Sequence, residues 1–386
     1  MEWRVPLSDI DLGEGEIRAV TDVLMSKWLT MGEVTQRFEQ AFAEYLGVKH
    51  VFAVSNATVA LHLANAALGI GPGDEVIVPS LTFVATANAV KYTNAMPVFA
   101  DIASDVDLDI SPASVETAIT PATKAITVMH YGGYPCDMAA INAIARERGL
   151  AVIEDAAHAP GTQLDGKKAG AFGDVGCFSF FSNKNLATGE GGMIVTDRDD
   201  LAEQIRLMRS HGMTTLTWDR HKGHAYSYDV VTLGYNYRID EMRAALGLVQ
   251  LSKLEKSNAR RGEVTARYWE AFAGAKLTLP FRHPRGQSAF HIFPILLPHG
   301  VNRIQFIDNL RAKGVQTSIH YPPVHQFSYY RDQYPGVCLP ITEDVAAREV
   351  TLPLYPTMSD ERVEIVIEAV LSALEDRQPT ASNLGH

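Results

Sequence analysis

The chain has little cysteine, no cluster of basic residues and no apolar run long enough to cross a membrane. Its three cysteines, Cys136, Cys177 and Cys338, are scattered without a CxxC pair, which excludes a disulfide framework and a cysteine zinc site. The formal net charge of -11 argues against general nucleic-acid binding and against an anionic membrane surface. The N-terminal residues lack an apolar signal region, so we expect a cytoplasmic protein.

A large hydrophobic core is possible, because 46% of the 386 residues are hydrophobic, and this length suggests about two domains. From Val51 onward, short apolar runs alternate with helical patterns. The predicted strands are 51–55, 75–79, 96–100, 124–129, 150–154, 175–180 and 192–196, and helices are predicted at 58–68 and 138–148. Continuous apolar strands separated by helices indicate a mostly parallel sheet that is covered on both faces.

The predicted fold is α/β, with two unequal domains. Residues 1–255, including the N-terminal segment, form the large domain, which places a mixed, mostly parallel sheet between helices. The charge-rich stretch 240–273 is expected to form one or two helices that lead out of it. Residues 256–386 form a smaller α+β domain, with a strand at 291–297 and helices at 303–313 and 359–374.

Lys184 and Asp155 are the most informative pair of residues. Asp155 follows an apolar strand, where a carboxylate can keep a pyridinium nitrogen charged. Lys184 lies in a hydroxyl- and glycine-rich turn, where an amine can form an imine with an aldehyde. Each residue alone has a plainer interpretation, as a helix cap or a solvated charge. Together, in an α/β pattern, they predict a site for pyridoxal 5′-phosphate (PLP).

Other residues near strand ends fit the same cofactor. Residues 55–61 lie where a predicted strand turns into a helix, and free N–H groups and the helix dipole there suit a phosphate, although the alternative is that Asn56 or Thr58 is only an N-cap. Ser179 could also bond the phosphate. His158 could reach the phenolic oxygen of PLP, although its position alone favours a core histidine. Phe83 could stack on the pyridine ring, or serve only in packing.

Rival cofactor sites find no support. The glycine runs 69–73 and 170–176 do not match G-x-G-x-x-G between a strand and a helix, so a dinucleotide fingerprint is set aside. The thirteen histidines include no HExxH pair or other metal spacing, and no metal site is predicted.

Longer motifs extend over nearly the whole chain. They are 28–32 (WLTMG), 38–42 (FEQAF), 55–58 (SNAT), 79–83 (PSLTF), 98–101 (VFAD), 134–138 (YPCDM), 154–159 (EDAAHA), 179–192, 234–238 (GYNYR), 320–322 (HYP) and 352–356 (LPLYP). With this combination the chain resembles the DegT/DnrJ/EryC1/StrS family of PLP-dependent sugar aminotransferases, a branch of the fold-type I aspartate aminotransferase superfamily.

The resemblance implies roles for individual residues. The implied cofactor-binding set is Ala57, Thr58, Phe83, Asp155, His158, Ser179, Lys184 and Asn236. Lys184 and Asp155 would be the catalytic pair, with Lys184 as the PLP-linked lysine and the base that moves a proton. Asn236 matches a residue that reaches the phosphate from the neighbouring subunit, which implies a homodimer with shared sites. Some relatives carry His in place of the lysine and perform deoxygenation, so the presence of Lys184 favours transamination.

The implied reaction moves the amino group of L-glutamate to a nucleotide-linked keto-deoxysugar, with PLP and its amino form, PMP, alternating. The expected substrate is a dTDP- or UDP-4-keto-6-deoxyhexose aminated at C4, a preference drawn from the segment 210–238. One alternative is a C3 aminotransferase acting on a 3-keto sugar nucleotide. Another is a different PLP enzyme of the same fold, such as a desulfurase, which would need a mobile cysteine. A regulator would need a DNA-binding appendage or loss of Lys184.

Overall fold

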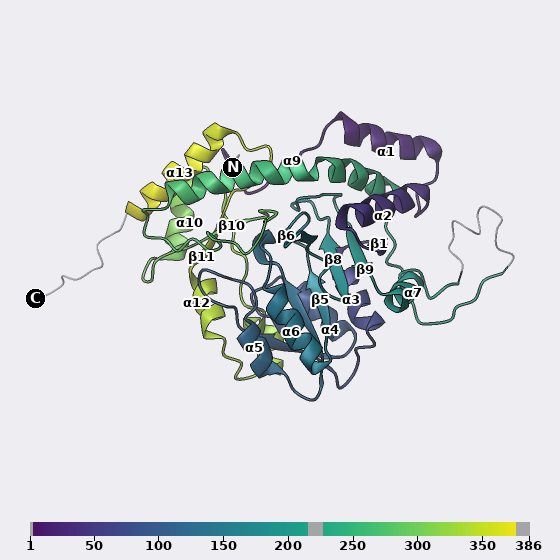
Figure 1. The fold of residues 1–386 in the computed structure, drawn as a ribbon. Helices are drawn as coiled ribbons and strands as arrows, with labels where there is room; N and C mark the ends of the chain where they lie inside the picture. The colour runs from purple at the N-terminus through teal and green to yellow at the C-terminus, as the bar shows by residue number, and fades with distance from the viewer. Residues whose placement is uncertain (1–2, 215–226, 376–386) are drawn as a thin grey trace, which may run out of the picture.

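A seven-stranded sheet forms the centre of the structure, in the order β1-β9-β8-β5-β4-β2-β3 (Figure 1). The computed structural model describes residues 3–214 and 227–375. The strands are β1 (His50–Val54), β2 (Glu75–Pro79), β3 (Met96–Ala100), β4 (Thr123–Met129), β5 (Ala151–Asp155), β8 (Val175–Ser179) and β9 (Gly192–Thr196). Strands β8, β5, β4, β2 and β3 pair in parallel, whereas β9 runs antiparallel to both of its neighbours. The predicted mixed, mostly parallel sheet is therefore confirmed.

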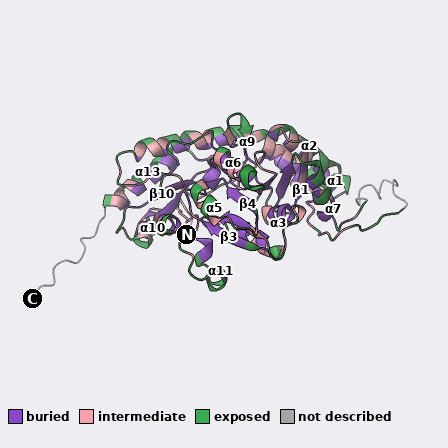
Figure 2. Cartoon of the chain, turned by 60° about the horizontal axis from the view of Figure 1, so that its bottom comes forward, coloured by how far each residue is buried: buried purple, intermediate pink, exposed green. Residues whose placement is uncertain are grey.

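Helices cover both faces of the sheet, because successive side chains of a strand point to opposite faces. On β2, Val76 and Val78 join one core cluster with residues of α3 and α4, while Ile77 joins another with residues of α5 and α6. Figure 2 shows the strands buried between these layers. The surrounding helices are α1 (Glu14–Ser26), α2 (Glu33–Leu46), α3 (Ala57–Ala67), α4 (Ala85–Tyr92), α5 (Pro112–Ala118), α6 (Met138–Arg148) and α7 (Asp199–Met208).

A single long helix, α9 (Glu241–Ala271), joins the two parts of the fold (Figure 1). It begins after Asp240, whose side chain accepts a hydrogen bond from the Arg243 N–H at 2.9 Å. Its first half packs on α1 and α2, and its second half contributes Val264 and Tyr268 to the C-terminal core. The domain boundary expected after residue 255 lies within this helix. Although α9 is long, none of the helices in residues 3–214 and 227–375 is apolar enough over a sufficient length to cross a membrane.

The C-terminal part combines strands and helices, as the sequence predicts. Strands β10 (Phe293–Leu296) and β11 (Glu349–Leu352) form an antiparallel pair. The helices of this part of the chain are α10 (Arg303–Ala312), α11 (Ser328–Gln333), α12 (Pro340–Arg348) and α13 (Asp360–Glu375), of which α11 packs through Tyr330 on the core of the large sheet. This part also contains the 3₁₀ turn η2 (Val324–Gln326).

Three further short elements lie earlier in the described chain. They are the strands β6 (Gln163–Leu164) and β7 (Lys167–Lys168) and the 3₁₀ turn η1 (Tyr131–Gly133).

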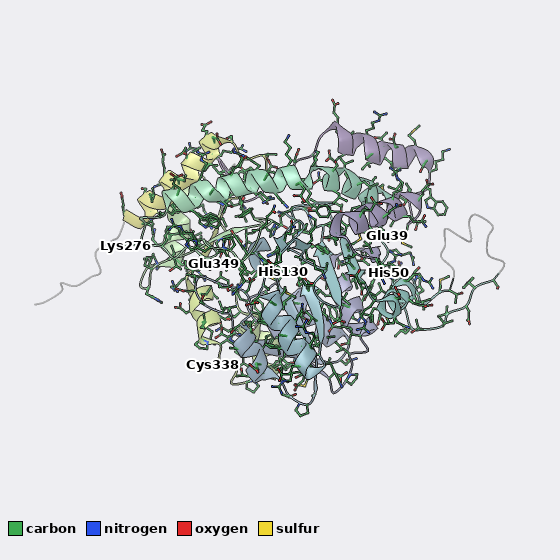
Figure 3. The ribbon with its side chains drawn as sticks, in the orientation of Figure 1. Glu39, His50, His130, Lys276, Cys338 and Glu349 are labelled. Atoms are coloured by element: carbon green, nitrogen blue, oxygen red, sulfur yellow. The ribbon has the colours of Figure 1, made fainter. Side chains whose placement is uncertain are left out.

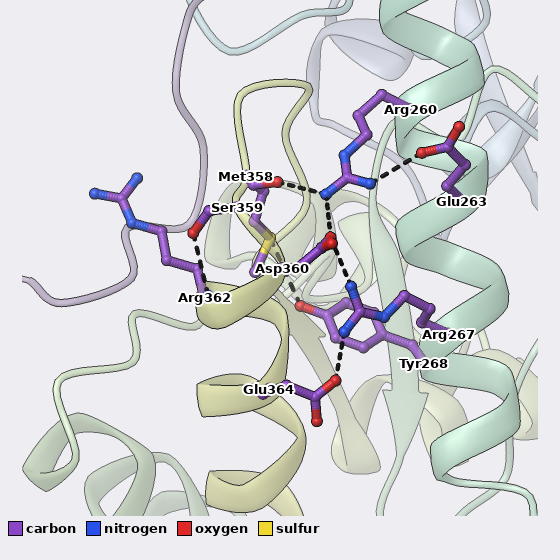
Figure 4. A network of polar contacts seen from close by, with 9 residues as sticks. All are labelled: Arg260, Glu263, Arg267, Tyr268, Met358, Ser359, Asp360, Arg362 and Glu364. Carbon is purple, nitrogen blue, oxygen red and sulfur yellow. Dashed lines mark hydrogen bonds and ion pairs between the residues drawn. The ribbon is translucent and has the colours of Figure 1, made fainter.

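Charged side chains join α9 to the start of α13 (Figure 4). The carboxylate of Asp360 accepts hydrogen bonds from Arg260 and Arg267, each at 2.7 Å, and Arg267 also pairs with Glu364. Arg260 further donates to the Met358 carbonyl at 2.8 Å. Exposed ion pairs contribute little singly. A carboxylate shared by two arginines links α9 to the start of α13 at the surface, beside the apolar contacts of Val264 and Tyr268 with the C-terminal core.

Candidate active site

A cavity of about 460 Å³ opens at the carboxyl ends of the parallel strands. Such an edge is where ligands bind in open α/β sheets. It is lined by Asn56, Ala57, Thr58, Leu61, Phe83, Ala85, Met129, Asp155, Ala157, His158, Ser179, Phe181, Asn183, Lys184, Glu190, His320 and Tyr321. The structure thus brings together every residue that the sequence assigned to the cofactor except Asn236. A larger cavity of about 600 Å³ lies elsewhere, beside Tyr134 and Arg285, and contains none of them.

The N-terminus of α3 forms one end of this cavity. Asn56 caps the helix, since its side chain accepts the Val59 N–H at 3.0 Å. The N–H groups of Ala57 and Thr58 precede the internal hydrogen bonds of the helix and border the cavity. Gly192, at the start of β9, passes so close that a Cβ there would lie 2.6 Å from the Asn56 carbonyl carbon and 2.8 Å from the Ala57 nitrogen. This glycine lets the strand and the helix N-terminus meet.

Asp155 ends β5 and is buried. Its carboxylate accepts hydrogen bonds from the Thr86 hydroxyl at 2.8 Å and from the Ala157 N–H at 3.1 Å. Burial raises the pKa of Asp155, and these two hydrogen bonds and the positive charge of Lys184 oppose the rise. A buried carboxylate held in this way is well suited to a protonated ring nitrogen, which would place a further positive charge beside it.

Lys184 lies in the loop between β8 and β9, where its N–H bonds the Phe181 carbonyl at 2.9 Å. Burial lowers the pKa of the Lys184 amine to about 8, and the nearby carboxylate of Asp155 acts in the opposite direction. A sizeable fraction of the amine is therefore neutral near physiological pH. Only the neutral form can attack a carbonyl or accept a proton.

His158 is a neutral hydrogen-bond donor in this site. The Gly132 N–H donates to its Nδ1 at 3.3 Å, so the ring proton sits on Nε2, which lies 2.9 Å from the Tyr321 hydroxyl. Burial lowers the pKa of His158 well below its ordinary value, and the charge of Lys184 adds to this effect. The neutral imidazole therefore carries its one N–H at Nε2, where it can donate to an oxygen placed in the cavity.

Phe83 and Ser179 lie at the cavity in different surroundings. Phe83 is 56% exposed, which is unusual for a ring in an α/β core, and its centroid lies 6.0 Å from that of Tyr321. Its open face leaves room for a flat ligand ring. Ser179 ends β8 opposite Gly192 and is buried beside the N-terminus of α3, where its hydroxyl can add to the phosphate donors.

His320 and Tyr321 are site residues to which the sequence analysis gave no role, although both belong to the 320–322 motif. His320 Nδ1 lies 2.8 Å from the Thr351 hydroxyl, which donates to Glu349 at 2.5 Å. Glu349, labelled in Figure 3, also accepts the His320 N–H at 2.8 Å. Burial raises the pKa of Glu349 to about 8. Thr86 was missed as well, because only the fold brings it to Asp155.

Asn236 lies outside the cavity of its own chain. It pairs with Ser210 beyond the end of α7, and the neighbouring Tyr237 carbonyl accepts the Ser55 N–H at 2.9 Å. The described residues that line the cavity do not include Asn236. The role that the resemblance implies for Asn236, contact with the phosphate bound by a neighbouring subunit, therefore stays a prediction.

The residues present fit PLP. One cavity holds a buried carboxylate for a pyridinium, an amine that is partly neutral, a helix N-terminus for a phosphate and an exposed ring for stacking. A further polar atom, Asn183 Oδ1, is buried without a hydrogen-bond partner, and its residue lines the same cavity. Buried polar atoms are normally paired, so an unpaired one at this wall is consistent with a polar ligand.

Comparison with known proteins supports this interpretation. The sequence model of the DegT/DnrJ/EryC1/StrS aminotransferase family matches residues 10–371. The chain is 44% identical over 367 residues to the spore coat polysaccharide biosynthesis protein SpsC of Bacillus subtilis, covering 93% of this chain and 94% of that protein. It is 37% identical to the aminotransferase TlmJ from Streptoalloteichus hindustanus, with a TM-score of 0.90 over 96% of this chain and 99% of TlmJ.

The fold also matches Spr1654 from Streptococcus pneumoniae, described as a sugar aminotransferase, in its PLP form. The identity is 28% and the TM-score 0.89, over 96% of this chain and 98% of Spr1654. Aminotransferases of this family depend on PLP. The family match over nearly the whole chain agrees with the cavity that contains Lys184 and Asp155. The chain therefore belongs to the DegT/DnrJ/EryC1/StrS aminotransferase family and is a sugar aminotransferase.

Proposed function

We propose that this protein transfers the amino group of L-glutamate to the keto group of a nucleotide-linked 4-keto-6-deoxyhexose, at C4. The observation that carries the proposal is the meeting of Lys184, Asp155 and the N-terminus of α3 in one cavity. When bound, PLP supplies the electron sink for the carbon that loses or gains a proton. The protein supplies binding, orientation and proton transfer.

The phosphate and the ring nitrogen are held by different walls of the cavity. The N–H groups of Ala57 and Thr58 and the hydroxyl of Ser179 bind the phosphate, because the helix N-terminus carries partial positive charge. Asp155 keeps the ring nitrogen protonated, since an ion pair in a site with little water favours both charged forms. The Thr86 hydroxyl orients the Asp155 carboxylate for this contact.

Proton transfer falls to Lys184. Its amine, with a pKa of about 8, is neutral often enough to accept a proton at Nζ and is then charged to return it. Phe83 holds one face of the ring by stacking, and the Nε2–H of His158 donates to the phenolic oxygen. The hydroxyl of Tyr321, 2.9 Å from His158 Nε2, holds that imidazole in this orientation.

The substrate class is drawn from the family and its relatives. SpsC serves spore coat polysaccharide biosynthesis, as its name states, and an amino-deoxysugar for a polysaccharide or an antibiotic fits that setting. The preference for C4 rests on the segment 210–238, of which residues 215–226 lie outside the described residues. dTDP and UDP are the nucleotides that we expect.

The active site is proposed to be completed by a second copy of the chain. Asn236 is placed away from the cavity of its own chain, as expected if it serves the neighbouring site. Val230, Val231 and Leu233, which precede Asn236, are each more than half exposed. Exposed apolar side chains grouped in this way are typical of a surface that a partner covers.

The test uses the PMP-loaded protein and a panel of keto-sugar nucleotides. Return of the PLP absorbance reports amino transfer. We expect it with a dTDP- or UDP-4-keto-6-deoxyhexose, and not with Lys184→Ala. A response to 3-keto sugars alone would support amination at C3 instead. No response to any keto sugar, from a protein that does load PMP, would contradict the proposal.

A further inference from the structure

His291 lies directly beside the amine of Lys184. The Nε2 atom of His291 is 3.5 Å from Lys184 Nζ, at the limit of a hydrogen bond. His291 is buried just before β10, and it is not one of the residues that line the cavity of about 460 Å³. The two residues come from different parts of the fold, so this contact exists only because the C-terminal part packs against the large sheet.

A chain of amide groups fixes the tautomer of His291. Asn258 Nδ2 donates to the Pro160 carbonyl at 2.8 Å, which leaves Asn258 Oδ1 to accept from Asn185 Nδ2 at 2.7 Å. Asn185 Nδ2 also donates to the Ala289 carbonyl at 2.7 Å. Carbonyl oxygens only accept, so the orientation of both amides is determined. Asn185 Oδ1 then faces His291 Nδ1 at 2.9 Å, and that nitrogen must carry the hydrogen.

The other ring nitrogen therefore presents a lone pair to Lys184. Burial lowers the pKa of His291 well below its ordinary value, and the positive charges of Lys184 and Arg261 act in the same direction. The ring is neutral across the range in which Lys184 titrates. The Arg261 guanidinium is occupied by the carbonyls of His291 and Leu354, at 3.2 and 2.8 Å, rather than by the ring.

We propose that His291 is a positioning residue that holds the Lys184 amine through Nε2 whenever that amine is not joined to the cofactor. The inference rests on the proposed role of Lys184. In the PMP form no bond joins Lys184 to the cofactor, and a long, partly exposed side chain without an acceptor could adopt other rotamers. An acceptor at Nε2 keeps the amine facing the site and stabilises its ammonium form, because a lone pair bonds a charged donor more strongly than a neutral one.

The experiment measures the pH midpoint at which Lys184 becomes reactive. The PMP-loaded protein, and the same protein without cofactor, are acetylated with acetic anhydride in short pulses across pH, and the Lys184 peptide is quantified by mass spectrometry. The variants are His291→Leu, which removes the acceptor, and His291→Gln, which places an amide oxygen near the position of Nε2. His325→Leu is the matched control, because His325 is also buried and hydrogen-bonded through both ring nitrogens, to Ser80 and Glu343.

We expect the His291→Leu midpoint to fall by about one pH unit, as loss of a hydrogen bond to a charged group predicts. His291→Gln and His325→Leu should stay near the unsubstituted protein. An unchanged midpoint in His291→Leu would mean that His291 only packs against Lys184. A raised midpoint would mean that its ring is a charged imidazolium. Either result would overturn the proposal. Thermal unfolding shows that each variant is folded. Labelling of Lys184 does not require turnover. The midpoint can therefore be measured even if the protein fails the transamination assay, so failure of this inference can be told apart from failure of the proposed function.

Discussion

Burial acts in opposite directions on the acid and the base of the active site. It raises the pKa of Asp155 and lowers that of Lys184, because a water-poor site disfavours both charges. The attraction between the two groups partly offsets each shift. Hydrogen bonds from Thr86 and Ala157 also oppose the rise in the pKa of Asp155, while a pKa of about 8 makes Lys184 a usable base.

Asp155→Ala should lower turnover by several orders of magnitude while leaving most of the fold intact. Without the carboxylate, the ring nitrogen of the cofactor loses its proton and the electron sink weakens, which appears as lost transition-state stabilisation. Single-turnover rates and circular dichroism check this, with Asp308→Ala, exposed on α10, as the control. Near-normal turnover in Asp155→Ala would rule out the proposed role.

Glu349 predicts a pH dependence of stability. Its carboxyl has a folded pKa of about 8, against an ordinary value of 4.5, because burial favours the neutral acid. The folded state binds the extra proton, so the stabilisation is complete below about pH 4.5 and is lost as the pH rises through about 8. The loss should amount to a few kcal/mol, in the range of about 2–5. Urea unfolding between pH 5 and 9 should show this fall, and Glu349→Gln should flatten it. Parallel curves for both proteins would contradict the assignment.

At the scale of elements, the site is built where strand ends meet one helix N-terminus. Strands β5 and β8 deliver Asp155 and Ser179 at the same edge, since parallel strands share a carboxyl edge. The antiparallel β9 starts at this edge, and Gly192 touches the first residues of α3. The phosphate end of the site thus depends on a close contact between two backbones.

Gly192→Ala should reduce both stability and cofactor affinity. The added Cβ would lie 2.7 Å from the Phe178 carbonyl oxygen and 2.8 Å from the Ala57 nitrogen, and backbone atoms cannot turn away as a side chain can. We expect a loss of about 1–3 kcal/mol in unfolding free energy, and weaker binding in a PLP titration. Gly274→Ala is the control, because a Cβ there meets nothing within 4 Å. Equal behaviour of the two variants would argue against the close contact.

Most elements of the fold could be predicted from the sequence, because the pattern that indicates each strand or helix lies within its own segment. Buried strands such as Glu75–Pro79 and Met96–Ala100 are continuous apolar runs, and their bounds agree with the prediction. Lys184 and Asp155 could be singled out because they lie at or after the ends of such runs, and the structure places both at one cavity. His291, His320 and Thr86 could not be assigned a place at the site, because no local pattern shows which distant segments fold against it. The sequence likewise did not decide between one helix and two over residues 240–273, because the single helix α9 packs on different parts of the fold at its two ends.

At the scale of the whole molecule, the central question is whether two chains share each site. The resemblance places Asn236 against the phosphate of a partner, and the structure keeps it away from the cavity of its own chain. A C2 arrangement would put the same exposed segment of each chain against the other. The apolar residues Val230, Val231 and Leu233 would then be covered.

Mixing Lys184→Ala with Asn236→Ala under subunit exchange should restore activity. Each variant alone is expected to be severely impaired. A heterodimer with shared sites holds one site with both residues intact and one with neither, so activity should rise towards half per dimer. If both residues served the site of their own chain, every heterodimer site would be defective and no recovery would appear. An active monomer at assay concentration would also argue against shared sites.

The identity of the lysine that carries the cofactor tests the proposed active site most directly. The protein is loaded with PLP, reduced with borohydride to make the attachment permanent, and digested for peptide mapping by mass spectrometry. We predict a yellow protein whose reduced cofactor is found on the peptide that contains Lys184. No such product is expected from Lys184→Ala, which can hold PLP only non-covalently. Reduced cofactor on another lysine, with Lys184 unmodified, would contradict the assignment of this cavity as the active site.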